Sequence, residues 1–332
     1  MNNMEQKYLS LYHSGELRQR VERLETRLSS CDICPRKCGV NRLKNEHGYC
    51  HSGYLPVVSS YCAHHGEEPA ISGHNGSGTI FFANCNMKCA FCQNFQISQN
   101  WQDQQYHEIN CQTLAEQMIY LQDTLKCHNI NFVSPSHFVP QIVRAVLLAI
   151  PLGLKIPLVY NTNGYDSRDT LRELEEIIGI YLPDIKYASN KWAKKFSDTE
   201  NYVEHSRFAI KEMYRQAGNL IVDKKGIAQK GLIVRHLILP HGLADSRESL
   251  TWLANEISPD ITLSIMSQYL PQNRAPQILP ISRKITVSEY NEVTLLLEEL
   301  GMENGWLQGM DSPEAYVPDF NRKNHPFTTE TE

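Results

Sequence analysis

Short apolar runs alternate with amphipathic stretches over most of the chain from residue 78 onwards. The apolar runs are β-prone and typical of strands, and they lie at 79–83, 130–133, 156–160, 180–186, 232–239 and 261–266. The stretches that follow them have helical spacing, at 114–126, 139–150, 170–178, about 191–217, 246–257 and 287–301. Strands that alternate with helices predict right-handed βαβ units and an α/β fold with a mostly parallel sheet. The pattern leaves open whether this sheet closes partway into a barrel or stays open and doubly wound.

The start of the chain has a different pattern. Apolar residues at helical spacing predict one helix over 5–28, and they are Leu17, Val21, Leu24 and Leu28. A cysteine-bearing loop region follows, and 54–78, rich in Gly, Ser, His and Pro, is expected to be irregular. We divide the chain into an N-terminal helical, cysteine-rich extension (1–73), an α/β core (74–275) and a C-terminal helix with a tail (276–332). The tail is polar beyond Tyr316 and is expected to be mobile.

The charge of the chain argues against several partners. Lys and Arg number 32 and Asp and Glu number 37, so the formal net charge of the 332 residues is −5. No basic patch of the kind that binds nucleic acid or an anionic membrane stands out. The apolar runs are too short to span a bilayer, and the first residues lack the apolar core of a secretory signal. We therefore expect a cytoplasmic protein with no nucleic-acid or membrane partner.

All ten cysteines lie within the first 127 residues. A disulfide scaffold of this length would spread its cysteines along the chain, whereas tight clusters in a cytoplasmic protein are typical of metal or iron–sulfur sites. Two clusters occur, at 31–50 and 85–92. Cys62, Cys111 and Cys127 fall outside both clusters and are expected to be structural.

The second cluster, Cys85, Cys89 and Cys92, has the spacing C-x3-C-x2-C directly after the first predicted strand. Three thiolates on one loop can hold three corners of a [4Fe–4S] cluster and leave one iron open to a small molecule. Two plainer interpretations stay open: a zinc site that awaits a distant fourth ligand, and buried free thiols.

This stretch resembles the signature of the radical S-adenosylmethionine (radical SAM) enzymes. The resemblance implies a [4Fe–4S] cluster on the three cysteines, with SAM chelated to the open iron. It further implies reductive cleavage of SAM to methionine and a 5′-deoxyadenosyl radical, which takes a hydrogen atom from a substrate. Phe91 would pack near the adenine, and the fold would be a partial (β/α)6 barrel.

Further segments are similar to pyruvate formate-lyase-activating enzyme and to an uncharacterised subgroup of its homologues. The subgroup resemblance rests on 31–42, 67–73, 76–82 and 160–166, and the match runs from about 31 to 318. Pro183-Asp184-Ile185-Lys186 and Val234-Arg235-His236 end strands whose polar residues would contact SAM. The resemblance thus implies SAM-site roles for Asp184, Lys186, Arg235 and His236, although Asp184 and Lys186 could instead form a structural ion pair.

One departure from that pattern affects the SAM site. Where the family often has a Gly-Gly-Glu stretch after the second strand, this chain has Ser134-Pro135-Ser136-His137 and no carboxylate. Ser134 and His137 are the local substitutes. Asn161, after the third strand, is suited to neutral hydrogen bonding with the ribose or methionine moiety, or it belongs to a strand-to-helix turn.

The first cluster, Cys31, Cys34, Cys38 and Cys50, could close a structural zinc site or hold an auxiliary iron–sulfur cluster. Unliganded thiols are the third alternative. Lys37, Arg36 and Arg42 would offset the charge of four thiolates.

The function expected from these features is hydrogen abstraction by a radical SAM enzyme. Its substrate is an unidentified protein or small molecule, and its electron donor would resemble flavodoxin or ferredoxin. The activase resemblance suggests a glycyl radical made on a partner protein, and modification of a peptide or small molecule is the alternative. A zinc or iron–sulfur protein that only binds partners or transfers electrons is the competing class.

Overall fold

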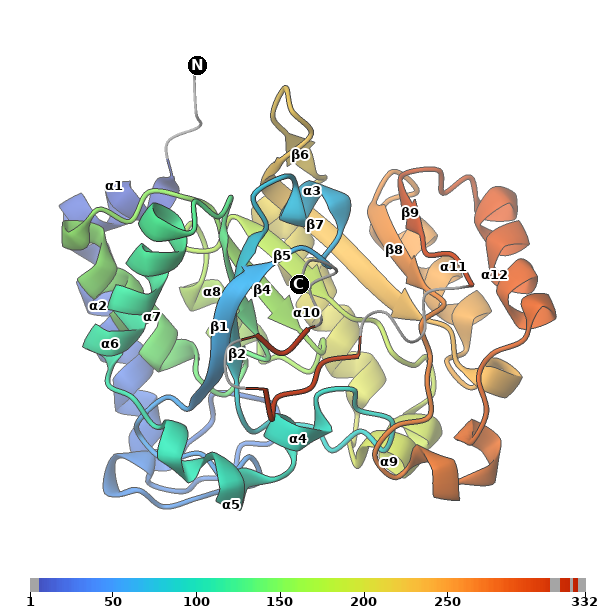
Figure 1. The fold of residues 1–332 in the computed structure, drawn as a ribbon, viewed down its shortest axis with the longest axis horizontal. Helices are drawn as coiled ribbons and strands as arrows, with labels where there is room; N and C mark the ends of the chain where they lie inside the picture. The colour runs from blue at the N-terminus through green and yellow to red at the C-terminus, as the bar shows by residue number, and fades with distance from the viewer. Residues whose placement is uncertain (1–5, 311–316, 323–324, 328–332) are drawn as a thin grey trace.

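The protein is built on one nine-stranded sheet within residues 6–310, 317–322 and 325–327, which are the residues that this computed structural model describes. The strand order is β1-β2-β3-β4-β5-β7-β8-β9, and β6 pairs with β7 off this path (Figure 1). The strands are β1 (Val58–His64), β2 (Ser77–Phe82), β3 (Ile130–Val133), β4 (Leu158–Thr162), β5 (Ile180–Pro183), β6 (Ile221–Val222), β7 (Ala228–Leu237), β8 (Thr262–Met266) and β9 (Gly305–Leu307).

Neighbouring strands from β2 to β9 along this order run parallel, and the edge strand β1 is antiparallel to β2. The edges β1 and β9 do not pair with each other, so the sheet is not closed. This confirms the α/β class and all six predicted strands. Strand β1 was missed, because its sequence VSSYCAH is half polar and lies in the segment expected to be irregular.

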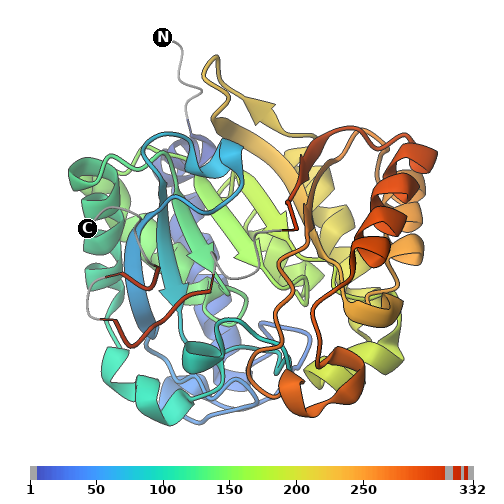
Figure 2. The ribbon, with the colours of Figure 1, turned by 45° about the vertical axis from the view of Figure 1, so that its right-hand side comes forward.

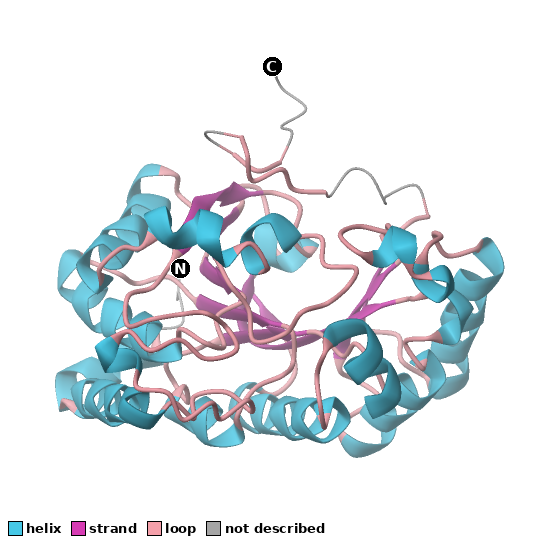
Figure 3. Cartoon of the chain, turned by 90° about the horizontal axis from the view of Figure 1, so that it is seen from below, coloured by secondary structure: helices cyan, strands magenta, loops and turns pink. Residues whose placement is uncertain are grey.

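The longer helices follow one side of the curved sheet, as the view from below in Figure 3 shows. Figure 2 shows α11 and α12 beside β8 and β9. The helices are α1 (Lys7–Ser14), α2 (Glu16–Thr26), α3 (Pro69–Ser72), α4 (Phe95–Ser98), α5 (Trp101–Gln104), α6 (Cys111–Ile119), α7 (Val139–Ala149), α8 (Arg168–Glu173), α9 (Asn190–Ser197), α10 (Tyr202–Ala217), α11 (Ser246–Glu256) and α12 (Val287–Leu300). No helix among the described residues is both long and apolar enough to cross a bilayer.

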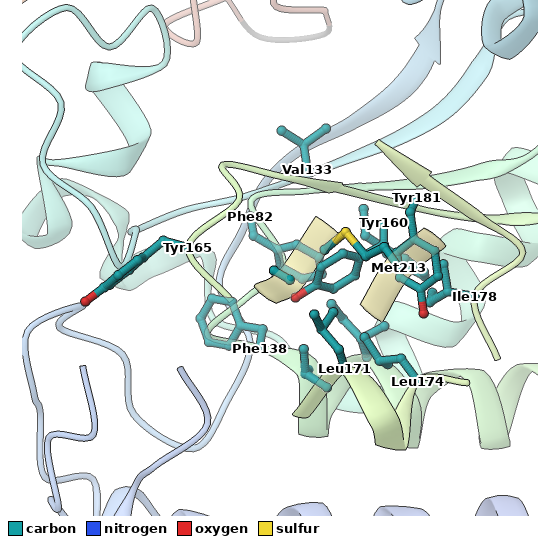
Figure 4. Close-up of a cluster of buried hydrophobic side chains, with 14 of the residues drawn as sticks. Phe82, Val133, Phe138, Tyr160, Tyr165, Leu171, Leu174, Ile178, Tyr181 and Met213 are labelled. Atoms are coloured by element: carbon teal, nitrogen blue, oxygen red, sulfur yellow. The ribbon is translucent and has the colours of Figure 1, made fainter. Parts of the chain in front are cut away.

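The main core lies between the sheet and these helices. Figure 4 shows part of it, where Phe82 and Tyr160 of the sheet pack with Phe138, Leu171 and Met213. All five side chains are buried. Burial of aromatic and aliphatic area of this kind is the main stabilising contribution to the fold.

A second, smaller core fills the concave side at the amino ends of the parallel strands. There Ala70 and Ile71 of α3 pack against Val159, Ile180 and Ile233. Helix α3 therefore closes this end of the partial barrel, and the carboxyl ends of the strands remain for a site.

Three predictions at the chain ends and in one helix need correction. The first predicted helix is two helices, because Gly15 adopts φ +83° between α1 and α2. The predicted helix at 191–217 is also two, since Asp198 and Asn201 have positive φ between α9 and α10. The described part of the tail is packed, with the Phe327 ring stacked on His64 at a centroid distance of 4.0 Å.

Candidate active site

The carboxyl ends of the parallel strands converge on a cavity of about 500 Å³. It receives residues from the ends of β2, β3, β4, β5, β7, β8 and β9. Its wall is completed by His64, by residues 66–69 and by the tail residues Pro318 and Phe327. In a parallel α/β sheet this is the end at which ligands bind. We call this space the strand-end cavity.

The loop after β2 carries the three clustered cysteines to the strand-end cavity. Asn84 precedes Cys85 and turns the chain with φ +67°, a conformation that Asn tolerates better than most residues. Its backbone N–H donates to the carbonyl of Ile97 at 2.8 Å, which ties the two ends of the loop together. Cys85, Cys89 and Cys92 all line the cavity.

Each of the three sulfurs has a hydrogen-bond partner from the chain. The backbone N–H of Met87 and the side-chain amide of Asn163 donate to Cys85 Sγ, both at 3.4 Å. The Ser197 hydroxyl donates to Cys89 Sγ at 3.1 Å, and Ser98 Oγ lies 3.2 Å from Cys92 Sγ. Hydrogen bonds to sulfur tune the potential of iron–sulfur clusters, so this environment suits thiolate ligands.

Burial of the cysteines determines how they would bind a metal. Within the described ranges, no three His, Cys, Asp or Glu side chains converge on one point that could hold a metal ion. Burial raises the pKa of the Cys85 thiol to about 12 and that of Cys92 to about 11. Without a metal these thiols are therefore protonated at neutral pH, and metal binding must displace the protons.

Opposite the cysteines, the ends of β4, β5 and β7 form a buried charged group. Asp184 accepts from Lys186 Nζ at 2.5 Å and from Arg235 Nε at 2.9 Å. Arg235 Nη2 also donates to Asn161 Oδ1 at 2.5 Å. Burial favours a raised pKa for Asp184, but the cations of Arg235 and Lys186 outweigh it and hold that pKa below its usual range. Asp184 is therefore ionised at neutral pH.

Glu67 and Glu68 add two carboxylates that the sequence analysis did not assign to the site. They precede α3, line the strand-end cavity and reach the same charged group from its far end. Asn131 donates to Glu67 Oε1 at 3.1 Å, and Glu67 Oε2 lies 3.6 Å from Arg235 Nη1. Burial raises the pKa of both carboxyls, and Glu68 Oε2 has no hydrogen-bond partner. In the sequence, the two adjacent glutamates directly before Pro69 could have indicated that this segment belongs to the site.

Phe91 and Ser134 also line the strand-end cavity. Phe91 is packed edge-on against Tyr269 at a centroid distance of 5.7 Å, which fixes its ring at the wall. Ser134 has φ +57° at the end of β3, an unusual conformation for serine that re-aims the chain at the site.

Two predicted SAM-site residues lie elsewhere. His236 neighbours Arg235 on β7, and because side chains alternate across a strand it points to the opposite face. There it is buried, with Nδ1 2.8 Å from the Ile185 carbonyl and Nε2 2.8 Å from Ser246 Oγ. His137 is also buried, with Nε2 3.0 Å from the Ala83 carbonyl, and it lines a second cavity. That second cavity holds the N-terminal cysteines Cys31, Cys34, Cys38 and Cys50.

Comparison with known proteins gives one relative in sequence and several in structure, and no family model matches the chain. An uncharacterized protein of Methanocaldococcus jannaschii, MJ0674, is 28% identical over 292 residues, which cover 86% of this chain and 79% of that protein.

Solved structures share the arrangement of strands and helices only loosely. HydG, a maturase of the [FeFe]-hydrogenase, has a TM-score of 0.46 at 10% identity over 69% of this chain, which spans about half of the HydG chain (50%). TYW1, solved with a lysine-pyruvate adduct, has a TM-score of 0.43 at 12% identity, over 75% of this chain and 83% of that one. OxsB, described as a cobalamin-dependent S-adenosylmethionine radical enzyme, has a TM-score of 0.38 at 13% identity, over 76% of this chain and 39% of that one. Likeness at this level carries no functional argument.

Proposed function

We propose that this chain is a radical SAM enzyme whose cluster is held by Cys85, Cys89 and Cys92. One observation carries the proposal: the three cysteines of a C-x3-C-x2-C loop line one wall of the strand-end cavity, and each sulfur has a polar partner. A [4Fe–4S] cluster bound there would supply an open iron for SAM and the electron that cleaves SAM to methionine and a hydrogen-abstracting radical.

The charged group opposite the cysteines is suited to the polar end of SAM. Three carboxyl groups (Glu67, Glu68 and Asp184) and two cations (Lys186 and Arg235) line the cavity. Burial raises the pKa of the Glu67 and Glu68 carboxyls, and the sulfonium and ammonium groups of SAM would favour their ionised forms. The buried, paired geometry fixes these groups before the ligand arrives, which lowers the cost of ordering them on binding.

The strand-end cavity also carries groups that would orient the neutral parts of SAM and exclude water. Asn161 offers an amide next to Arg235, and the ring of Phe91 offers an apolar wall. The tail residue Phe327 covers His64 on the side of β1. Exclusion of bulk water protects a reactive radical from side reactions.

The test is chemical. The protein is purified anaerobically, reconstituted with iron and sulfide, reduced with dithionite and incubated with SAM. We expect 5′-deoxyadenosine and methionine to form in equal amounts, slowly in the absence of substrate. A reconstituted protein that contains iron and sulfide but forms no 5′-deoxyadenosine above the protein-free control would contradict the proposal.

A further inference from the structure

A second group of cysteines surrounds a small cavity in the N-terminal extension. Cys31, Cys34, Cys38 and Cys50 all line it, and the other six cysteines do not. Cys31 and Cys34 are buried, and Cys50 is half-buried. Four thiols from a twenty-residue stretch therefore line one cavity. The packing of cysteine as a small apolar side chain does not explain this convergence. We call this space the four-thiol cavity.

The backbone around the four-thiol cavity is folded tightly, with one 3-10 turn at Arg42–Lys44 and otherwise without helix or strand. Cys31 N–H donates to the Val40 carbonyl at 2.9 Å, and Gly39 N–H returns a bond to the Cys31 carbonyl at 3.0 Å. The Tyr49 N–H donates to Cys38 Sγ at 3.4 Å. Gly48 lies so close that a Cβ there would be 2.8 Å from the same sulfur. Backbone N–H groups directed at cysteine sulfur are suited to a ligating thiolate.

Two buried polar atoms at the four-thiol cavity have no partner in the protein. Arg42 is 1% exposed, and its Nε and Nη1 donate to the carbonyls of Gly53 and His137, yet its Nη2 is unpaired. The Nδ1 atom of His137 is likewise unpaired. A buried guanidinium nitrogen without a partner is costly, and its presence beside thiols indicates that a negative charge completes this site.

Further cations line the same cavity. Arg36 and Lys37 join Arg42 there. Of the two acidic side chains in the 31–50 stretch, Asp32 is paired with Arg27 at 2.7 Å and Glu46 accepts from the backbone N–H of Asn41 at 2.7 Å. Four thiolates around a divalent metal carry a net charge of about −2. The cations therefore match a thiolate–metal centre and would repel one another around four neutral thiols.

We propose that Cys31, Cys34, Cys38 and Cys50 hold a second metal centre with four thiolate ligands, which takes a thiophilic metal. Zinc and iron–sulfur share this ligand chemistry, and metal content distinguishes them. The described thiols do not converge on a single-ion point, so one zinc requires their side chains to turn, whereas a cluster needs a wider spacing.

The proposed centre is connected to the first site through Arg36. Its Nε donates to the carbonyl of Asn86 at 2.9 Å, next to Cys85, and its guanidinium stacks on the Tyr49 ring at 3.6 Å. The second centre would thus fix a segment that supports the Cys85 loop. The proposal does not rest on SAM chemistry, because it concerns other ligands.

The test separates the two sites by using the full chain with Cys85, Cys89 and Cys92 all replaced by Ala. After anaerobic purification and reconstitution, we expect this variant to retain about one zinc, or about two to four iron with matching sulfide, per chain. Adding Cys34→Ser should remove that metal, and adding Cys127→Ser, a buried cysteine outside both cavities, should not. No bound metal in the triple variant, or metal that survives Cys34→Ser, would overturn the proposal.

A second measurement covers the case in which Cys34→Ser does not fold. The wild-type protein, kept anaerobic, is treated with a thiol-alkylating reagent under native conditions with and without a strong chelator, and labelled sites are mapped by mass spectrometry. We expect exposed Cys38 to resist labelling until the chelator is added. Labelling of Cys38 that is rapid and indifferent to chelator would overturn the proposal.

Discussion

At the scale of single residues, the candidate site depends on side chains whose chemistry is visible in the sequence and whose orientation is not. The triplet cysteines, Asp184 and Arg235 all line the strand-end cavity. His236 does not, because one position along a strand reverses the face, and a pattern of apolar residues on both faces does not reveal which face is inward.

The first residue-scale prediction concerns the cluster ligands. Cys89→Ala should lose all formation of 5′-deoxyadenosine and about four iron per chain relative to the wild type, because two thiolates do not hold the cluster of the triplet. Cys127→Ala, which removes a thiol of similar burial outside the strand-end cavity, should retain both. Iron content, absorbance and product are measured on matched preparations. Full cleavage activity in Cys89→Ala would show that the three cysteines do not hold the cluster that cleaves SAM.

The second residue-scale prediction concerns the ion pairs. Asp184→Asn leaves Lys186 and Arg235 without their shared carboxylate, and breaking a buried charge pair is costly. We expect SAM binding to weaken at least about tenfold, or ~1.4 kcal/mol, with cluster content unchanged. Asp260→Asn, at an exposed position, serves as the control and should bind SAM normally. Calorimetric titration with SAM measures both variants, and equal affinities would exclude Asp184 from the site.

At the scale of elements, the six central strands were predictable because each contains a short apolar run, and β2, β3, β4 and β5 are buried on both faces. The placement of Glu67 and Glu68 was not, because it depends on how α3 closes the far end of the sheet. The local pattern of apolar residues identifies a helix or strand. Whether that helix or strand contacts a distant cavity depends on tertiary packing, which the pattern does not show. The break at Gly15 was also missed, because the predicted helix rested on the apolar spacing from Leu17 to Leu28, which begins after Gly15.

The element-scale prediction concerns the approach of the loop after β4 to the end of β5. Gly164 has φ +80°, and a Cβ there would lie 2.3 Å from the carbonyl oxygen of Asp184. Gly153 also has a positive φ, +107°, but a Cβ there meets nothing within 4 Å. Gly164→Ala should therefore lower the midpoint of thermal unfolding more than Gly153→Ala, because only the first adds a backbone clash to the conformational strain.

Thermal unfolding followed by circular dichroism, under identical anaerobic conditions, compares the two glycine variants. Because Gly164 sits beside the Asp184 carbonyl, Gly164→Ala should also weaken SAM binding, while Gly153→Ala should not. Equal unfolding midpoints for both variants would contradict the close approach of the two loops.

At the scale of the whole molecule, the buried histidines make the stability depend on pH. Burial lowers the pKa of His236 to about 4, whereas an unfolded histidine titrates near 6.5. Between these values the unfolded chain binds more protons than the folded one, so stability is complete above about pH 6.5 and is lost as the pH falls towards 4. For His236 alone this amounts to at most about 2 kcal/mol at pH 5.

The matched variant is His236→Asn, whose amide can replace the Nδ1 donor to the Ile185 carbonyl. We expect the loss of unfolding free energy between pH 7 and pH 5, measured by denaturant titration, to be smaller in this variant than in the wild type. An identical pH dependence in the two proteins would show that His236 is not buried in its neutral form.

The fold also connects the strand-end cavity with the four-thiol cavity, although their cysteines form separate clusters in the sequence. Arg23 of α2, in the N-terminal extension, pairs with Glu173 at 2.9 Å. Further along the extension, Arg36 donates to the Asn86 carbonyl next to Cys85. The extension therefore belongs to the architecture of the site, which cysteine spacing alone could not establish.

The central claim is that the triplet holds a cluster that binds SAM directly, and electron paramagnetic resonance tests it most directly. The anaerobically reconstituted protein is reduced, and its spectrum is recorded without and with SAM, with Asp184→Asn measured in parallel. The account predicts a reduced-cluster signal that changes on addition of SAM in the wild type and changes less at the same SAM concentration in Asp184→Asn. A reduced-cluster signal that saturating SAM leaves unchanged in the wild type would contradict it.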